Sequence, residues 1–134
     1  MDKLTEAARS ALMAKVHGKN TLPERTVRRL LHSLGYRYRL HYKQLPGKPD
    51  LVFPSRRKAI FVNGCFWHGH SCPRGKLPTT RINFWTAKIA GNTKRDRRNR
   101  AALVKAGWSV LAVWECELRN PLRAVSRMVR FLDG

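Results

Sequence analysis

Three residues that suit a soft metal ion lie within an eight-residue span: Cys65, His70 and Cys72. Thiolate and imidazole groups suit Zn²⁺, which takes four tetrahedral ligands at structural sites. The chain has only one further cysteine, Cys116, so a Cys₃His site would use every thiol. The alternative is three buried, unreactive cysteines with His70 as an ordinary loop histidine. The close spacing favours the metal site, although it matches no common zinc finger.

Carboxylates are scarce, so any acid–base or metal chemistry that needs them must draw on eight residues. Asp50 ends a turn directly before an expected strand, where it could hold Mg²⁺ against a phosphate. Its position alone favours a turn carboxylate paired with a nearby lysine. Glu24 stands three residues after Thr21, which predicts a capping box at a helix start. His68 could act as a general acid or base, and Asp96 could orient it, although its basic neighbours favour a helix ion pair.

The charge balance points to a polyanionic partner. The 134 residues include 28 Lys or Arg and 8 Asp or Glu, which gives a formal net charge of +20. Basic charge this dense attracts nucleic acid and makes its binding sensitive to salt. Phe66, Trp67, Phe84 and Trp85 stand in polar or basic surroundings, where aromatic rings could wedge between bases. The alternative is a minor core beneath the loop, which we expect for Phe84.

Length and apolar content predict one globular domain. Hydrophobic residues make up 43% of the chain, which is enough for a core at this size and argues against disorder. No apolar run approaches the ~20 residues of a membrane span, and the first ten residues lack the apolar core of a signal peptide. An odd number of cysteines without an export signal indicates reduced thiols in the cytosol. These features argue against a membrane protein and a secreted disulfide scaffold.

Periodicity and turn residues predict the elements that must position these side chains. Helices are expected at residues 3–16, 21–34, 81–90, 92–106 and 121–132, with Gly91 separating the third from the fourth. Strands are expected at residues 36–42, 51–53, 59–62 and 108–114. The last strand is nearly all apolar, which predicts a central position with both faces buried. This order predicts an α/β fold, with a small mixed sheet covered by helices on both sides.

Five blocks of the sequence resemble the very-short-patch repair (Vsr) endonucleases. They are Leu45–Asp50 (LPGKPD), Ile60–Cys72 (IFVNGCFWHGHSC), Phe84–Ile89 (FWTAKI), Arg95–Arg98 (RDRR) and Val113–Cys116 (VWEC). The GCFWH and WEC segments are the most specific, and the similarity extends over nearly the whole chain. The resemblance implies a restriction-endonuclease-like fold. It also implies an enzyme that nicks DNA 5′ to the thymine of a T:G mismatch left by deamination of 5-methylcytosine.

The resemblance also implies roles for individual residues. Asp50 would be a Mg²⁺ ligand together with the backbone carbonyl of Val62, and Glu24 would reach the active site. His68 would be the catalytic histidine, with Asp96 as its partner carboxylate. The implied structural zinc ligands are Cys65, His70, Cys72 and Cys116. The implied DNA contacts are Met13, from the minor groove, the aromatic wedge of Phe66, Trp67 and Trp85, and Lys88.

One position departs from the family pattern: Asn63 stands where the best-known members carry a second active-site histidine. An amide can hydrogen-bond a phosphate, but it cannot shuttle a proton near neutral pH. The expected chemistry therefore rests on Asp50, Mg²⁺ and His68, with either a lower rate or one histidine sufficing. The expected organisation is a DNA-contacting helical arm at residues 1–20 and one catalytic domain at residues 21–134. We expect a monomer in the bacterial cytoplasm, associated with the nucleoid, with mismatch-repair proteins as candidate partners.

Two other functions are compatible with the same residues. The first is a non-catalytic, zinc-stabilised DNA-binding module, in which Asp50 and His68 would be dispensable. The second is a nickase of the same fold with a different structural or sequence target, which would need Asp50 and Mg²⁺ but would ignore T:G. A nicking assay on mismatched, matched and branched duplexes separates these functions.

Overall fold

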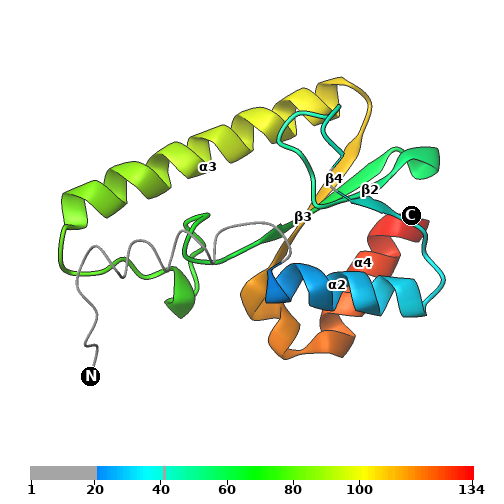
Figure 1. Cartoon of the computed structure of the whole chain (residues 1–134), viewed down its shortest axis with the longest axis horizontal. Helices are drawn as coiled ribbons and strands as arrows, with labels where there is room; N and C mark the ends of the chain where they lie inside the picture. The colour runs from blue at the N-terminus through cyan, green and yellow to red at the C-terminus, as the bar shows by residue number, and fades with distance from the viewer. Residues whose placement is uncertain (1–20, 41) are drawn as a thin grey trace.

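A four-stranded mixed sheet with helices on both faces forms the body of the protein (Figure 1). The computed structural model describes residues 21–40 and 42–134, so the expected helix at 3–16, and Met13 within it, lie outside the described residues. The helices are α2 (Leu22–Ser33), α3 (Ile82–Lys105) and α4 (Pro121–Asp133). The strands are β1 (Arg39–Leu40), β2 (Leu51–Phe53), β3 (Lys58–Asn63) and β4 (Ser109–Trp114). Short 3-10 helices are η1 (Pro54–Arg56), η2 (Pro73–Gly75) and η3 (Glu115–Arg119).

The sheet has the strand order β1-β2-β3-β4. The pairs β1/β2 and β2/β3 are antiparallel, while β3 and β4 are parallel and are connected through α3. The prediction of a small mixed sheet in an α/β fold is confirmed. Within the described part of the chain, no helix is long and apolar enough to cross a membrane.

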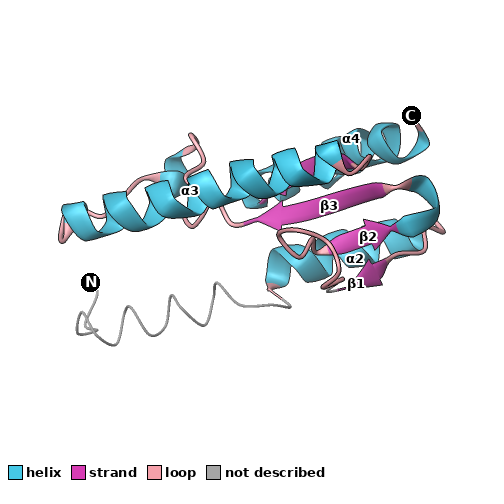
Figure 2. Ribbon diagram, turned by 90° about the horizontal axis from the view of Figure 1, so that it is seen from above, coloured by secondary structure: helices cyan, strands magenta, loops and turns pink. Residues whose placement is uncertain are grey.

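The two faces of the sheet are covered differently. Helices α2 and α4 lie on one face, which we call the core face, and α3 lies on the other, the α3 face (Figures 1 and 2). Ile60 and Val62 of β3 join the hydrophobic core on the core face, whereas Phe61 and Asn63 line a cavity beneath α3. This division follows from the period-two alternation of side chains along a strand. One strand therefore contributes to both the core and the α3 face.

The expected break at Gly91 is wrong, because α3 is one continuous helix of 24 residues. A single glycine inside a helix costs only about 1 kcal/mol relative to alanine. Buried contacts on both sides of Gly91, by Trp85 and Ile89 before it and Leu103 after it, offset that cost. The amino-terminal half of α3 consequently projects past the end of the sheet (Figure 2).

Two strand predictions also need correction. Of the expected strand at residues 36–42, the described residues 36–40 and 42 contribute only Arg39–Leu40 to a strand, both exposed. Strand β4 lies at the edge of the sheet rather than in its centre. Its apolar residues are explained by contacts with α3 on one side and α4 on the other, which cover both faces of an edge strand.

Candidate functional site

The candidate site lies where β3 and β4 end. Asn63 and Trp114 are Cα partners at the last position of their parallel ladder. Asp50 lies beside this position, because it directly precedes β2 and its Oδ2 accepts a hydrogen bond of 2.7 Å from the backbone N–H of Val62. Glu24 reaches the same region from the first turn of α2. Residues far apart in the chain therefore meet at one end of the sheet.

Asp50 and Glu24 form a buried acidic pair. The pKa of Asp50 is raised to about 7, because burial and, to a smaller extent, the neighbouring Glu24 carboxylate outweigh the lowering effects of the Val62 N–H and His68. Glu24 is 6% exposed and lies 3.8 Å from a guanidinium nitrogen of Arg28. The capping prediction is confirmed in one respect, since the Glu24 N–H donates to Thr21 Oγ1 at 3.5 Å. The side chain of Glu24, in contrast, lies within hydrogen-bonding reach of Asp50.

His68 and Asp96 form a close pair across the space between the β3–α3 loop and α3. His68 Nδ1 lies 2.5 Å from Asp96 Oδ2. A carboxylate at Nδ1 favours the tautomer in which Nε2 carries the lone pair, and it also stabilises the protonated ring. Asp96 therefore does more than balance the arginines beside it in α3, which was the interpretation favoured by its position in the sequence.

The four expected zinc ligands lie together. One ligand atom from each of Cys65, His70, Cys72 and Cys116 can be chosen so that all lie within 4.8 Å of one another. The three cysteines are free thiols. Burial raises the pKa of Cys65 to about 12, whereas hydrogen bonds from His70 and Cys65 outweigh the burial of Cys72 and lower its pKa to about 6. Three sulfurs and one imidazole at this separation fit the donor set of a tetrahedral Zn²⁺.

Gly69 lies between His68 and His70, and it allows this part of the loop to lie against α3. Its φ of +64° is in the left-handed region, and a Cβ there would lie 2.9 Å from Ile89 Cγ2 and 3.1 Å from Thr93 Oγ1. Both the backbone conformation and the close packing therefore require glycine. The close approach lets His68 meet Asp96 on α3 while His70, two residues later, meets Cys116.

The aromatic residues of the loop and of α3 form a small cluster. Trp67 and Trp85 are only 8% and 6% exposed, and they pack with Ile89, Phe66 and Leu77. Ring centroids of Phe66, Trp67 and Trp85 lie 5.3 to 5.9 Å apart. Phe84 is 44% exposed, with the Arg81 guanidinium 4.4 Å from its ring centre, so the expectation that it packs beneath the loop is wrong. Lys88 is exposed on α3.

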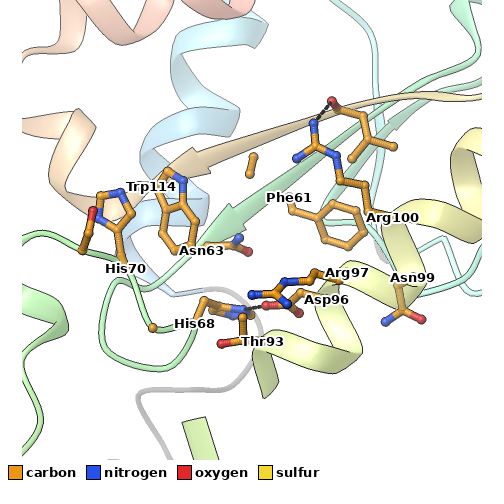
Figure 3. A pocket seen from close by; sticks show the side chains of 14 residues that line it. Phe61, Asn63, His68, His70, Thr93, Asp96, Arg97, Asn99, Arg100 and Trp114 are labelled. Carbon is orange, nitrogen blue, oxygen red and sulfur yellow. Dashed lines mark hydrogen bonds and ion pairs between the residues drawn. The ribbon is translucent and has the colours of Figure 1, made fainter. Parts of the chain in front are cut away.

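A cavity of about 360 Å³ lies between α3 and the sheet, beside the His68–Asp96 pair (Figure 3). Its lining includes residues that the sequence analysis did not single out: Phe61, Thr93, Arg97, Asn99, Arg100 and Trp114. Thr93, Asp96, Arg97 and Arg100 follow the i, i+3, i+4, i+7 spacing of one helix face. That spacing could have identified them if a single continuous α3 had been expected.

Comparisons with known proteins identify relatives over most of the chain. The family model described as "DNA mismatch endonuclease Vsr" matches residues 1–74. The type II nicking enzyme V.XorIIP of Xanthomonas oryzae pv. oryzae is 53% identical over 132 residues, which cover 98% of this chain and 97% of that protein. The DNA mismatch endonuclease Vsr of Escherichia coli K12 is 44% identical over 115 residues, covering 86% and 74% respectively. The type II nicking enzyme V.NmeAIP of Neisseria meningitidis is 43% identical over 131 residues, covering 98% and 94%.

The extent of these matches defines the protein as an endonuclease that acts on DNA. The chain belongs to the Vsr family of DNA mismatch endonucleases, as the resemblance in its sequence blocks predicted.

Proposed function

We propose that the protein nicks one strand of duplex DNA 5′ to the thymine of a T:G mismatch, in a Mg²⁺-dependent reaction on a restriction-endonuclease-like fold. The observation that carries this proposal is the meeting of the Asp50–Glu24 pair and the His68–Asp96 pair at one end of the sheet. The names of two relatives, a mismatch endonuclease and a nicking enzyme, agree with it.

Asp50, Glu24 and the backbone carbonyl of Val62 are the groups that would hold Mg²⁺. Burial, and to a smaller extent repulsion by the Glu24 carboxylate, raises the pKa of Asp50, and a bound divalent cation would offset both effects. The bound ion would supply charge neutralisation at the scissile phosphate.

His68 would move the proton. With Asp96 at Nδ1, the lone pair of Nε2 can accept a proton from the attacking water, and Asp96 stabilises the imidazolium that results. Asn63, which is buried at the end of β3, can donate a hydrogen bond to a phosphate oxygen but cannot take the proton. The chemistry is therefore a one-histidine version of the reaction.

The remaining site residues would find the mismatch and hold the loop in place. Cys65, His70, Cys72 and Cys116 would supply the four protein ligands of a structural zinc. Phe66, backed by the buried rings of Trp67 and Trp85, would form a wedge against the base stack, with Lys88 on the DNA backbone. A mismatched step costs less to unstack, so a wedge of this kind favours T:G over a matched pair.

The test is a nicking assay on T:G, G:C and branched duplexes, with Mg²⁺ or with a chelator of divalent ions. Asp50→Asn should lower the nicking rate roughly thousandfold, because a catalytic metal ion supplies several kcal/mol of transition-state stabilisation. DNA binding should remain close to that of the wild type. Asp133→Asn is the matched control, since Asp133 is an exposed carboxylate that contacts Tyr36 and Arg56 far from the site.

The alternatives give different results in the same assay. Nicking by Asp50→Asn at the wild-type rate would remove Asp50 from the mechanism. Equal nicking of T:G and G:C duplexes, or a preference for branched DNA, would indicate a nickase with another target. Tight DNA binding without nicking under any condition would indicate a binding module.

A further inference from the structure

The indole of Trp114 lies between two histidines that have different tasks (Figure 3). It stacks on the ring of His70, with centroids 4.2 Å apart and an interplanar angle of 18°. It meets the ring of His68 edge to face, with centroids 6.4 Å apart and an angle of 74°. His70 belongs to the metal-ligand cluster, and His68 is paired with Asp96. The Trp114 side chain thus contacts both the metal-ligand cluster and the His68–Asp96 pair.

Trp114 is itself held by elements outside the loop that carries the two histidines. Its backbone N–H donates to Glu117 Oε1 at 3.0 Å. Arg127 of α4 donates to both carboxylate oxygens of Glu117 at 2.7 Å and to the carbonyl of Ala112 at 3.1 Å. The end of β4 is therefore fixed to η3 and α4, so the indole offers a pre-positioned surface against which the loop can pack.

A histidine that transfers a proton needs its ring plane fixed as well as its tautomer. The contact between His68 Nδ1 and Asp96 Oδ2 anchors one ring atom, and packing against the ring helps to fix its plane. The edge-to-face contact with Trp114 restricts rotation of the His68 ring. Catalytic geometry is sensitive to such restriction, since a displacement of about 1 Å can cost roughly a hundredfold in rate.

The position of Trp114 also connects the two groups mechanically. His68 and His70 are separated only by Gly69, whose tight approach to Ile89 and Thr93 leaves the backbone little room to shift. Stacking on Trp114 fixes the His70 ring at one end of this short segment, and the edge contact limits the His68 ring at the other end. A change at Trp114 is therefore transmitted to the acid–base pair even if all four metal ligands remain in place.

We propose that Trp114 is a positioning residue for the nicking reaction, which holds the ring plane of His68 and ties the His68–Asp96 pair to the metal-ligand cluster through its stack on His70. This inference rests on the proposed role of His68. Trp114 acts through the two histidines and not on the substrate, so its loss should lower kcat and leave KM for the duplex nearly unchanged.

The experiment compares Trp114→Leu and Trp114→Phe with Trp108→Leu. Trp108 is a matched control, because it is a half-buried indole just before β4 that packs against Arg57 instead of the histidines. Trp114→Leu should lower kcat roughly tenfold to hundredfold, the range found when supporting residues of a site are removed, and should change KM by less than about twofold. Trp114→Phe should be intermediate, since a smaller ring can still stack on His70. Trp108→Leu should keep the wild-type kcat.

The zinc content of each variant and the nicking rate of His68→Ala are the two further measurements. Zinc per chain should be the same in Trp114→Leu and in the wild type, so that a fall in kcat reports orientation and not metal loss. A wild-type kcat in Trp114→Leu would overturn the inference, and so would a fall in kcat that is fully explained by loss of zinc.

If Trp114→Leu does not fold, Trp114→Phe is the deciding variant, and a wild-type kcat in Trp114→Phe would overturn the inference. If His68→Ala nicks at the wild-type rate, the proposed function of His68 fails first; if His68→Ala is inactive while Trp114→Leu is fully active, only the role of Trp114 fails.

Discussion

The core face and the α3 face of the same sheet differ in what holds them together. On the core face, α2 and α4 pack against β2, β3 and β4 through side chains with almost no exposed surface, including Leu31, Ile60 and Met128. On the α3 face, a helix of 24 residues has only Trp85, Ile89 and Leu103 buried, and a cavity lies between part of the helix and the strands. The hydrophobic effect stabilises the first face, whereas hydrogen bonds, ring contacts and a metal-ligand cluster organise the second.

The difference shows how a small protein can hold buried charge. Asp50, Glu24 and His68 need partial burial for their chemistry, and such burial costs stability. The hydrophobic cluster between α2, α4 and the sheet supplies the offsetting stability. Substitutions in the hydrophobic cluster should therefore lower stability without changing kcat. Loss of a metal ligand should lower both stability and kcat.

The largest effect is expected from Cys72→Ser, which removes a zinc ligand from the face that has little packing of its own. Binding of structural zinc is worth on the order of 10 kcal/mol in small zinc domains, and this binding energy is part of their folding energy. We expect one zinc per wild-type chain by metal analysis. The variant should lose the zinc and show a lower thermal midpoint or aggregation.

Ser71→Ala is the matched control, because Ser71 is the exposed neighbour of Cys72 and is not among the clustered ligands. It should keep both the zinc and the thermal midpoint. A wild-type protein that is fully folded without zinc would contradict the assignment of Cys65, His70, Cys72 and Cys116 as a structural site.

A smaller loss of stability, without loss of activity, is expected from Met128→Ala on the core face. Met128 is 0% exposed, and truncation of such a residue destabilises a protein by about 2–5 kcal/mol. Urea unfolding should show this loss, while kcat measured well below the unfolding transition should match the wild type. Leu122→Ala, at a residue of the same helix that is 84% exposed, should change neither quantity. A Met128→Ala variant that keeps its stability but loses kcat would show that the two faces are not independent.

The two faces also differ in how far the sequence could predict them. Helices α2 and α4 and strands β2 and β3 follow from apolar periodicity, a capping threonine and turn residues, because local pattern and burial agree there. The continuity of α3 across Gly91 depends on contacts made by residues before and after it, which a local rule cannot include. The edge position of β4 depends on which strand pairs with β3, and an apolar run does not specify its neighbours.

The same limit applies to the candidate site. Residue types and the family resemblance identified Asp50, His68 and the cluster of cysteines, since these groups have a recognisable chemistry. Trp114 has an ordinary aromatic side chain at the end of an apolar strand, so its position between two histidines is visible only in three dimensions. The expectation that Phe84 is buried is wrong while its neighbour Trp85 is buried, because the rotation of α3 decides which of two adjacent residues faces the loop.

The smallest expected effect is on the pH dependence of the unfolding free energy, and its sign follows from the pKa of Asp50. Burial raises the pKa of this carboxyl from 3.8 to about 7 in the folded protein, so between these values the folded state holds a proton that the unfolded state has released. Stability from this group is therefore fully present below the unfolded pKa and is lost as the pH rises toward 7. The Asp50→Asn variant has no titratable group at this position, so it does not lose stability in this way as the pH rises. Without Mg²⁺ at pH 8, the variant should be more stable than the wild type by about 1–3 kcal/mol.

Urea unfolding of both proteins from pH 5 to pH 8, with and without Mg²⁺, measures this difference directly. The gap in unfolding free energy should widen as the pH rises without Mg²⁺. Added Mg²⁺ should narrow the gap, because an ion that binds the folded wild type stabilises it by mass action and has a weaker site in the variant. Asp133→Asn should follow the wild-type pH dependence, since it leaves Asp50 in place. Parallel profiles for the wild type and Asp50→Asn would mean that Asp50 is ionised at little cost, and that the Asp50–Glu24 pair stores no electrostatic strain for a cation to relieve.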